Sequence, residues 1–356
     1  MKLACYSYRL PFSKPLHTSG QTFHHRKGFL LSLSTKEQLF YGEAAPLPGF
    51  STETYKSVQK LLTSHKQTIT KNLCAPKPIN KLQEFYQDFN IPPSLQFGID
   101  ALAYQVEAYN HDQSLLSYLF PDVSPQVEVN ALVSLQEEDD LKDVVGNMRA
   151  GFKTIKCKIG LQFDKELEFL HKIRNTYPEL TIRVDANQAW DLEKALDHCN
   201  KLDKLNIEYC EEPLTETTPA NLEQLSQQTA LPIALDESIT QHSYWPNLLP
   251  FTKYLIMKPM VVGSFQKNIE TKRLADTHNN KIVVTTSLES SVGRHFTGLI
   301  AAGLGTPQTA HGLSTGFLFA RDIFPEKKGI SEGSIDLSSR HLQTINFDQQ
   351  LFTKLF

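Results

Sequence analysis

Five charged positions in the middle of the chain recur at a nearly constant spacing. Lys158, Asp185, Glu211, Asp236 and Lys258 follow one another at steps of 27, 26, 25 and 22 residues, and each ends a short apolar run typical of a strand. Each step is about the length of one strand–helix unit, and the carboxyl ends of the strands of a parallel barrel meet at one face. We therefore expect the five side chains to form one site.

The three carboxylates predict a metal site. Asp185, Glu211 and Asp236 supply hard oxygen donors with no His or Cys beside them. Three protein ligands leave room for water and substrate oxygens, which suits Mg²⁺, with Mn²⁺ as a substitute, better than an all-protein Ca²⁺ cage. One such acid alone would be interpreted as a loop charge or a helix cap. Three at matching strand ends favour a bound cation.

The lysines supply bases beside this metal. Lys156 and Lys158 face the same way because side chains alternate along a strand. Two ammonium groups facing into a barrel repel each other, so a lysine there can be neutral near pH 7 and act as a base. Lys258 would approach the substrate from the opposite side. A metal that chelates a carboxylate, flanked by lysines, suits removal of the proton α to that carboxylate. Alone, the lysine pair could equally be two solvated side chains.

Eight strand-like segments alternate with helical ones, such as 165–174 and 192–202, and position these residues. The alternation predicts a (β/α)7β TIM-like barrel over residues 121–326, with its reacting groups at the carboxyl ends of the strands. The expected strands are 127–133, 153–158, 180–185, 206–211, 232–236, 254–258, 281–287 and 306–311.

Residues 1–120 follow a different pattern and predict an α+β domain. Residues 1–45 alternate as an antiparallel meander does, and 52–119 are mostly helical, including 94–109. Ser51 is the expected N-cap of the first helix, with Glu53 in its first turn. The segment 327–356 shows no strand–helix unit, so we expect it to pack back on this domain.

Composition narrows the class of protein. A net charge of −3 with no basic block argues against a nucleic-acid partner, and no apolar stretch approaches the ~18 residues of a membrane span. The five cysteines are odd in number and form no CxxC pair, and residues 1–14 lack the apolar run of a signal peptide. A cytoplasmic location is the expectation. Nothing in the sequence specifies an oligomeric state.

These motifs, in this order, resemble the enolase superfamily and, within it, the o-succinylbenzoate synthase family. The resemblance covers nearly the whole chain. It is carried by the loop that begins Gly42-Glu-Ala-Ala-Pro, by Lys-Cys-Lys at 156–158, and by Arg183-Val-Asp-Ala-Asn, Glu211-Glu-Pro, Asp236-Glu-Ser, Lys258-Pro-Met and Thr286-Ser-Leu-Glu-Ser-Ser. Sites of this superfamily pair a Lys or His base with Mg²⁺ that stabilises an enediolate.

The resemblance implies a function and residue roles. The expected reaction is Mg²⁺-dependent dehydration of 2-succinyl-6-hydroxy-2,4-cyclohexadiene-1-carboxylate, a small-molecule carboxylate, to 2-succinylbenzoate in menaquinone biosynthesis. Lys158 would be the base and then the general acid, Lys258 would stabilise the enediolate, and Lys156 would tune Lys158. Asp185, Glu211 and Asp236 would hold Mg²⁺.

The resemblance also extends to substrate-binding residues and lids. Thr285, Ser287 and Gly312 match positions that hold the succinyl arm and carboxylates, and Arg183 and Asn187 match the polar set of the third strand. The first domain would cap the site and close it with two loops, one carrying Ser19 and Gly20 and the other carrying Pro48, Gly49 and Phe50. Ser314 stands where relatives often carry Asp, and His311 enters the eighth strand.

Alternative functions use the same lysines. Gly312-Leu-Ser-Thr lacks the Asp-x-Asp expected of a dipeptide epimerase, and Lys258 and Thr285–Ser287 do not match a mandelate-racemase-type site. Ser287-Leu-Glu-Ser-Ser disfavours a muconate-type cycloisomerase. N-succinylamino acid racemisation remains open, because its substrate also carries a succinyl arm. A non-catalytic barrel protein should have lost at least one of the five charged sites, and all five are present.

Overall fold

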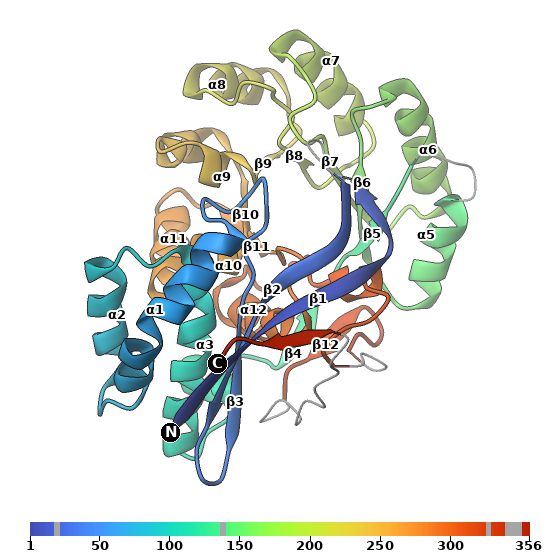
Figure 1. Ribbon diagram of the computed structural model, residues 1–356. Helices are drawn as coiled ribbons and strands as arrows, with labels where there is room; N and C mark the ends of the chain where they lie inside the picture. The colour runs from blue at the N-terminus through green and yellow to red at the C-terminus, as the bar shows by residue number, and fades with distance from the viewer. Residues whose placement is uncertain (18–21, 136–139, 325–328, 339–350) are drawn as a thin grey trace.

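A computed structural model describes residues 1–17, 22–135, 140–324, 329–338 and 351–356 (Figure 1). The N-terminal part is an antiparallel sheet of order β13-β1-β2-β3 with helices against it, which confirms the predicted meander. Its elements are β1 (Lys2–His17), β2 (Thr22–Ser34), β3 (Leu39–Ala44), α1 (Tyr55–Leu73), α2 (Pro78–Asp88), α3 (Pro93–Asn110), α4 (Leu115–Leu119) and β13 (Phe352–Lys354).

The start of α1 differs from the expectation at Ser51 and Glu53. Thr54 caps this helix in a capping box with Ser57. The Thr54 hydroxyl accepts the Ser57 N–H, and the Ser57 hydroxyl accepts the Thr54 N–H. The Ser51 hydroxyl instead accepts a hydrogen bond from the Leu47 N–H at 2.8 Å, within the preceding loop. The Glu53 carboxylate accepts from the Ser94 N–H at 2.9 Å, so it caps α3. A partner 41 residues away cannot be inferred from local sequence.

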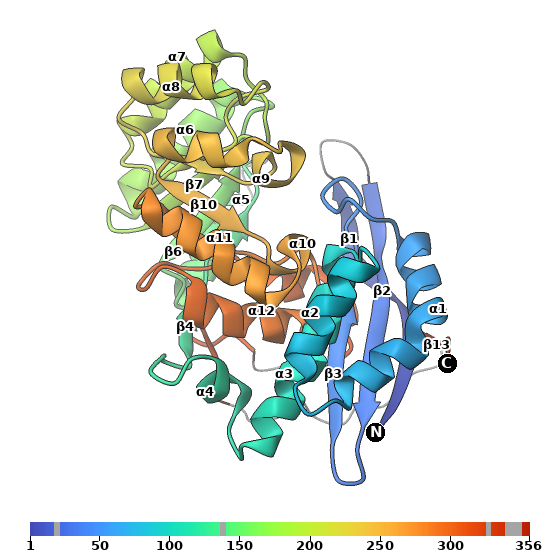
Figure 2. The same cartoon turned by 90° about the vertical axis from the view of Figure 1, so that its left-hand side faces the viewer.

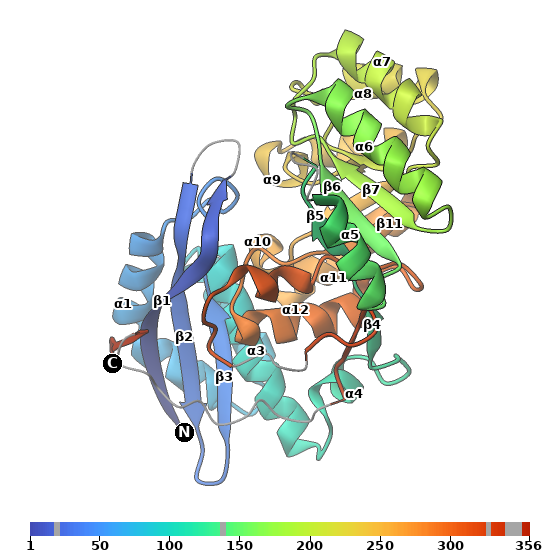
Figure 3. The same ribbon diagram turned by 90° about the vertical axis from the view of Figure 1, so that its right-hand side faces the viewer.

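The C-terminal part is the predicted barrel. Seven parallel strands follow the order β11-β10-β9-β8-β7-β6-β5, and helices cover their outer face (Figures 1 and 3). Its strands are β5 (Ala131–Val133), β6 (Thr154–Lys158), β7 (Thr181–Asp185), β8 (Cys210–Glu211), β9 (Ile233–Leu235), β10 (Tyr254–Met257) and β11 (Lys281–Val284). The helices between and after them are α5 (Asp140–Arg149), α6 (Phe163–Thr176), α7 (Leu192–Asp203), α8 (Pro219–Gln228), α9 (Ser238–Gln241), η1 (Trp245–Phe251), α10 (Pro259–Val262), α11 (Phe265–Thr277), α12 (Ser291–Leu304) and η2 (Ser314–Leu318).

The eighth strand is reduced to two parallel bridges, which close the ring. Val129 pairs with His311, and Thr285 pairs with Gly312. The main-chain N–H of His311 donates to the carbonyl of Glu128 at 2.8 Å on one side. The N–H of Gly312 donates to the carbonyl of Val284 at 2.9 Å on the other side. The residues after this segment therefore lie at the same mouth as the other strand ends.

Several predicted strands are shorter in the structure, among them 232–236 (β9) and 281–287 (β11), and two others change in a further way. The segment 127–133 divides into β4 (Gln126–Glu128) and β5, because β4 pairs antiparallel with β12 (Ser334–Asp336) before the chain enters the barrel. The fourth strand contains only Cys210 and Glu211, because Asn206 has a φ of 51° and turns the chain after α7.

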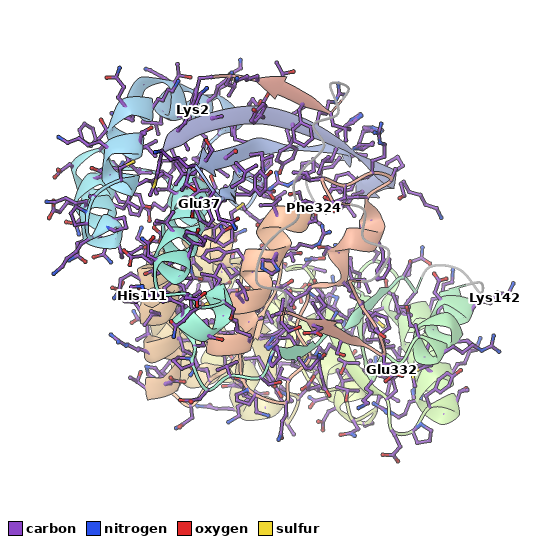
Figure 4. The ribbon with its side chains drawn as sticks, turned by 90° about the horizontal axis from the view of Figure 1, so that it is seen from below. Lys2, Glu37, His111, Lys142, Phe324 and Glu332 are labelled. Atoms are coloured by element: carbon purple, nitrogen blue, oxygen red, sulfur yellow. The ribbon has the colours of Figure 1, made fainter. Side chains whose placement is uncertain are left out.

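The cap sheet stands on one side of the barrel, with α3 between them (Figures 2 and 3). Phe324 lies at this junction (Figure 4), and its ring meets that of Tyr41 edge-on at 6.3 Å. In the segment predicted to pack back on the cap, β13 pairs with β1, whereas β12 pairs with β4. The domain boundaries near residues 120 and 326 stay predictions. Within the described ranges, no helix has the length and apolarity to cross a bilayer.

Asp100 is a buried carboxyl group at this junction. It accepts hydrogen bonds from the Phe265 N–H at 2.7 Å and from the Tyr86 hydroxyl at 2.6 Å. Burial raises its pKa from 3.8 to about 6, although both hydrogen bonds act in the opposite direction. The native state therefore takes up a proton between about pH 6 and pH 4 that the unfolded chain takes up only at lower pH.

The variant Asp100→Asn should gain stability relative to wild type as the pH rises from 4 to 7. The ionised carboxylate costs the native state free energy above its raised pKa, and the amide carries no such cost. A pKa difference of this size corresponds to about 3 kcal/mol. Urea unfolding of both proteins at each pH measures it. A difference in unfolding free energy that stays constant across this range would contradict the expectation.

Candidate active site

The carboxyl ends of adjacent barrel strands bring the predicted charged residues together. Lys158 pairs in register with Asp185, and Asp185 pairs with Glu211 on the next strand. Lys156, two residues before Lys158, links the two carboxylates: its ammonium lies 2.9 Å from Asp185 Oδ2 and 2.6 Å from Glu211 Oε1. The sequence spacing therefore corresponds to one spatial cluster.

Lys258 completes the cluster from β10, across the ring from β6. Its ammonium contacts Asp236 Oδ1, and the two side chains are 12% and 6% exposed. The ring of Phe50, from the second predicted lid loop, lies over this ammonium with its centroid 4.6 Å away, in a cation–π contact. Pro48 and Gly49 precede Phe50 in that loop, and Gly49 has the left-handed φ of 88° that favours glycine. The other predicted lid residues, Ser19 and Gly20, lie outside the described residues.

Burial and mutual proximity perturb the acids. Burial raises the pKa of Glu211 well above its usual value, and the neighbouring Asp185 raises it further. For Asp185 burial also favours the neutral form, but Lys156 and Lys158 outweigh it and lower the pKa. Three acids held this closely repel one another, so the cluster favours a positive charge between them.

The lysines differ in environment. Burial tends to lower the pKa of Lys156, but Asp185 and Glu211 outweigh it and raise the pKa well above the usual value. These carboxylates therefore favour the charged form of Lys156, and the role of base stays a prediction for Lys158. Lys158 is exposed at the end of β6 and makes no ion pair with any described residue.

The acids fit a divalent cation by their chemistry, and one oxygen lacks any partner. Glu211 Oε2 is buried without a hydrogen bond in the described part of the chain. All donors are hard carboxylate oxygens, as Mg²⁺ prefers. The ammonium groups of Lys156 and Lys258 contact one oxygen each of Asp185, Glu211 and Asp236, and Asp185 Oδ1 accepts the Asn187 N–H at 3.1 Å. Accordingly, no three His, Cys, Asp or Glu side chains among the described residues stand close enough to hold an ion as placed. Binding would require these carboxylates to exchange an ammonium partner for the cation.

A second layer of acids supports the cluster and was missed in the sequence. The Glu212 carboxylate accepts hydrogen bonds from the main-chain N–H groups of Asp236 at 2.7 Å and Ser238 at 2.8 Å. It thereby fixes the end of β9. The Glu237 carboxylate accepts from the Asn187 side-chain amide at 3.1 Å. The second acid in each of the motifs Glu-Glu-Pro and Asp-Glu-Ser is the sequence signal that could have indicated these supporting residues.

The predicted substrate-binding residues on the last two strands lie together. Thr285 and Gly312 line a cavity of about 50 Å³ with Lys156 and Glu211. Gly312 is required there, since a Cβ would lie 2.4 Å from the Thr285 hydroxyl. Ser287 is buried in the following loop, and its hydroxyl donates to the Glu289 carboxylate at 2.9 Å.

The two departures from the family pattern make structural contacts. The His311 imidazole accepts the Val284 N–H at 3.1 Å, and burial lowers the pKa of His311 to about 3. The Ser314 hydroxyl donates to the carbonyl of Asn130 at 2.6 Å. Both residues therefore stabilise the short eighth strand.

Arg183 is placed away from the cluster. Its side chain is 1% exposed and lies one layer below Asp185 in the barrel interior. The guanidinium pairs with Glu208 at 2.5 Å and donates to the Ala310 carbonyl at 2.6 Å. It faces a cavity of about 550 Å³ at the amino-terminal end of the strands. These contacts support a role in holding the barrel and do not support the predicted role in substrate binding.

Comparison with known proteins agrees with this architecture. The family described as enolase C-terminal domain-like matches residues 140–341, and the MenC N-terminal domain matches residues 1–106. The chain belongs to the enolase superfamily. Within it, the o-succinylbenzoate synthase of Pasteurella multocida is 26% identical over 98% of both chains. That of Haemophilus influenzae is 29% identical over 96% of this chain and 97% of its own.

Solved structures of superfamily members share the fold. Muconate lactonizing enzyme from Pseudomonas fluorescens aligns with a TM-score of 0.80 and 19% identity over 98% of this chain and 96% of its own. MenC from Desulfotalea psychrophila aligns with a TM-score of 0.76 and 20% identity over 94% of this chain and 99% of its own. Both likenesses concern the capped barrel.

Proposed function

We propose that this chain is a Mg²⁺-dependent lyase that dehydrates 2-succinyl-6-hydroxy-2,4-cyclohexadiene-1-carboxylate to 2-succinylbenzoate in menaquinone biosynthesis. The observation that carries the proposal is the cluster of three carboxylates and two lysine positions at adjacent strand ends. It occurs in a chain whose cap matches the MenC N-terminal domain. Curated relatives named for this activity match nearly its full length. A cytoplasmic location accompanies the proposal.

Lys158 performs both proton transfers in this reaction. As a neutral amine it removes the proton from C1 of the ring, α to the carboxylate, and the electrons of that C–H bond form the enediolate. The resulting ammonium then returns the proton to the hydroxyl at C6. The C–O bond breaks, water leaves, and the ring becomes aromatic. One amine serves both positions, so both groups leave from the same face.

The other residues hold charge around the substrate. Asp185, Glu211 and Asp236 would hold the divalent ion, which supplies positive charge to the substrate carboxylate when bound. Lys258 lies across the barrel mouth from Lys158, where its ammonium stabilises the negative charge of the enediolate. Phe50 covers that ammonium and excludes water from it. The cavity beside Thr285 and Gly312 would receive the succinyl arm.

A side-by-side assay tests the proposal. The purified protein is given the cyclohexadiene substrate or N-succinylamino acids, with Mg²⁺ or with chelator. We expect Mg²⁺-dependent dehydration to dominate, with any racemisation slower. Rapid racemisation with negligible dehydration would overturn the assignment. Inactivity on both substrates, with no change in melting temperature at millimolar Mg²⁺, would favour a non-catalytic barrel.

A further inference from the structure

Arg26 is a buried cation on β2. Its side chain is 3% exposed, and no carboxylate among the described residues pairs with it. Within the described ranges, the hydrogen bonds of its side chain all run to main-chain carbonyls, those of Lys27, Ala45, Pro46, Ser287 and Leu288. Five N–H donors in a planar fork match five carbonyls in fixed directions, which a lysine could not do.

Four of these carbonyls belong to two loops, and the fifth, that of Lys27, lies on β2 itself. Ala45 and Pro46 lead from β3 into the loop that carries Phe50, and the Pro46 carbonyl lies 2.8 Å from Arg26. Ser287 and Leu288 belong to the loop after β11, with carbonyls 3.2 Å and 2.9 Å from the guanidinium. One side chain therefore joins the base of the lid loop to the loop that follows Thr285, next to the cavity that would receive the succinyl arm.

Glu43, on the neighbouring strand β3, holds the next part of the same loop. It is fully buried, and its carboxylate accepts the N–H groups of Ser290 at 2.9 Å and Gly293 at 2.8 Å, at the N-terminus of α12. The Tyr8 hydroxyl donates to the same carboxylate at 2.5 Å. A Cβ at Gly293 would lie 3.0 Å from Glu43 Oε2, so the glycine permits this approach. The cap thus fixes the segment 287–293 at both ends.

We propose that Arg26 is a positioning residue that sets the affinity for substrates with a succinyl arm. It does so by holding the lid base and the arm-binding loop in one geometry, so that the two loops order together. This inference rests on the proposed function for its substrate. Arg26 contacts neither Lys158 nor the carboxylates, so its loss should weaken substrate binding while leaving proton transfer nearly intact.

Arg26→Lys tests the role through a split between KM and kcat. A hydrogen bond to a charged group changes an equilibrium constant by about 10- to 10²-fold, and loss of uniform binding raises KM alone, so we expect KM for the cyclohexadiene substrate to rise about 10- to 10²-fold. The value of kcat should change less than about threefold. An unchanged KM, or a fall in kcat equal to the rise in KM, would overturn the role.

Arg174→Lys is a matched control. Arg174 also donates to five main-chain carbonyls, including those of Leu205 at 2.9 Å and Pro178 at 2.7 Å. These carbonyls lie at the opposite end of the barrel, before β7 and β8. The control loses the same number of main-chain hydrogen bonds, from a partly exposed guanidinium, and should leave KM unchanged. Equal rises in KM for both variants would show that general destabilisation, and not positioning, explains the effect.

Hydrogen exchange of the wild-type protein tests the same link without turnover or a variant. Peptides covering 42–55 and 285–293 are followed with and without 2-succinylbenzoate. We expect the two peptides to exchange with matched protection in the free protein and to gain protection together with the ligand. Protection of one without the other would overturn the coupling. Absence of dehydration by the wild type would instead refute the proposed function. Matched protection of the two peptides in the free protein would still support the link that Arg26 makes between the two loops.

Discussion

Lys158→Ala should abolish dehydration, lowering kcat by about 10⁴-fold. A positioned general acid or base contributes on the order of 10²–10⁴-fold, and Lys158 serves as both in this reaction, which places the loss at the upper end. Neither other lysine can replace it, since Lys156 is paired with two carboxylates and Lys258 with Asp236. Steady-state kinetics measures the loss. Exchange of the C1 proton with deuterated solvent, followed by NMR, should disappear with it.

Lys153→Ala is the control for this variant. Lys153 precedes the same strand at its other end, is 81% exposed, and lies 3.9 Å from Glu128. Removing it deletes one positive charge from the same segment and should leave kcat within about twofold, because exposed pairs contribute little. If Lys158→Ala retained more than a tenth of wild-type kcat, another group would have to be the base.

Glu211→Gln should remove both metal binding and activity. The substitution keeps the size of a fully buried side chain, but it replaces a charged oxygen ligand in the centre of the three acids. Wild type should be stabilised by about 2.7 kcal/mol when Mg²⁺ is present at 100 times its Kd. The variant should show no stabilisation at the same concentration, and its kcat/KM should fall by about 10³-fold. Urea unfolding with and without Mg²⁺ measures the first effect.

Glu223→Gln serves as the comparison. Glu223 is an exposed acid on α8, the helix that follows the Glu211 strand. Its amide variant should retain the full Mg²⁺-dependent stabilisation and activity. Equal stabilisation of the Glu211 variant and wild type by Mg²⁺ would mean that the ion binds elsewhere.

The barrel and the grouping of charged residues were predictable because local signals determine both. A strand followed by a helix consumes about 25 residues, so acids that end successive strands must lie at neighbouring points on one rim. Asp185 is the last residue of β7 and Glu211 is the last residue of β8. These are the positions at which the predicted strands 180–185 and 206–211 end. The fold class depends on that periodicity and is confirmed by the structure and the family match.

Residues whose partners are distant in sequence could not be predicted. Arg183 stands in the motif Arg-Val-Asp-Ala-Asn beside the metal-ligand candidate Asp185. The orientation of its side chain, however, is set by Glu208 and by the carbonyl of Ala310, which is 127 residues away in the sequence. Arg26 and Glu212 bind main-chain groups, which leave no signature in side-chain sequence. Ser51 and Thr54 are equally good caps by residue type. The capping box with Ser57 selects Thr54.

The most direct test is to locate the metal in crystals grown with Mn²⁺ and 2-succinylbenzoate. Mn²⁺ scatters anomalously and substitutes for Mg²⁺ at oxygen ligands. We expect one anomalous peak about 2.1 Å from carboxylate oxygens of Asp185, Glu211 and Asp236, with the product carboxylate on the ion and the product ring between Lys158 and Lys258. A peak bonded to other residues, or product bound with these three carboxylates still paired only to lysines, would contradict it.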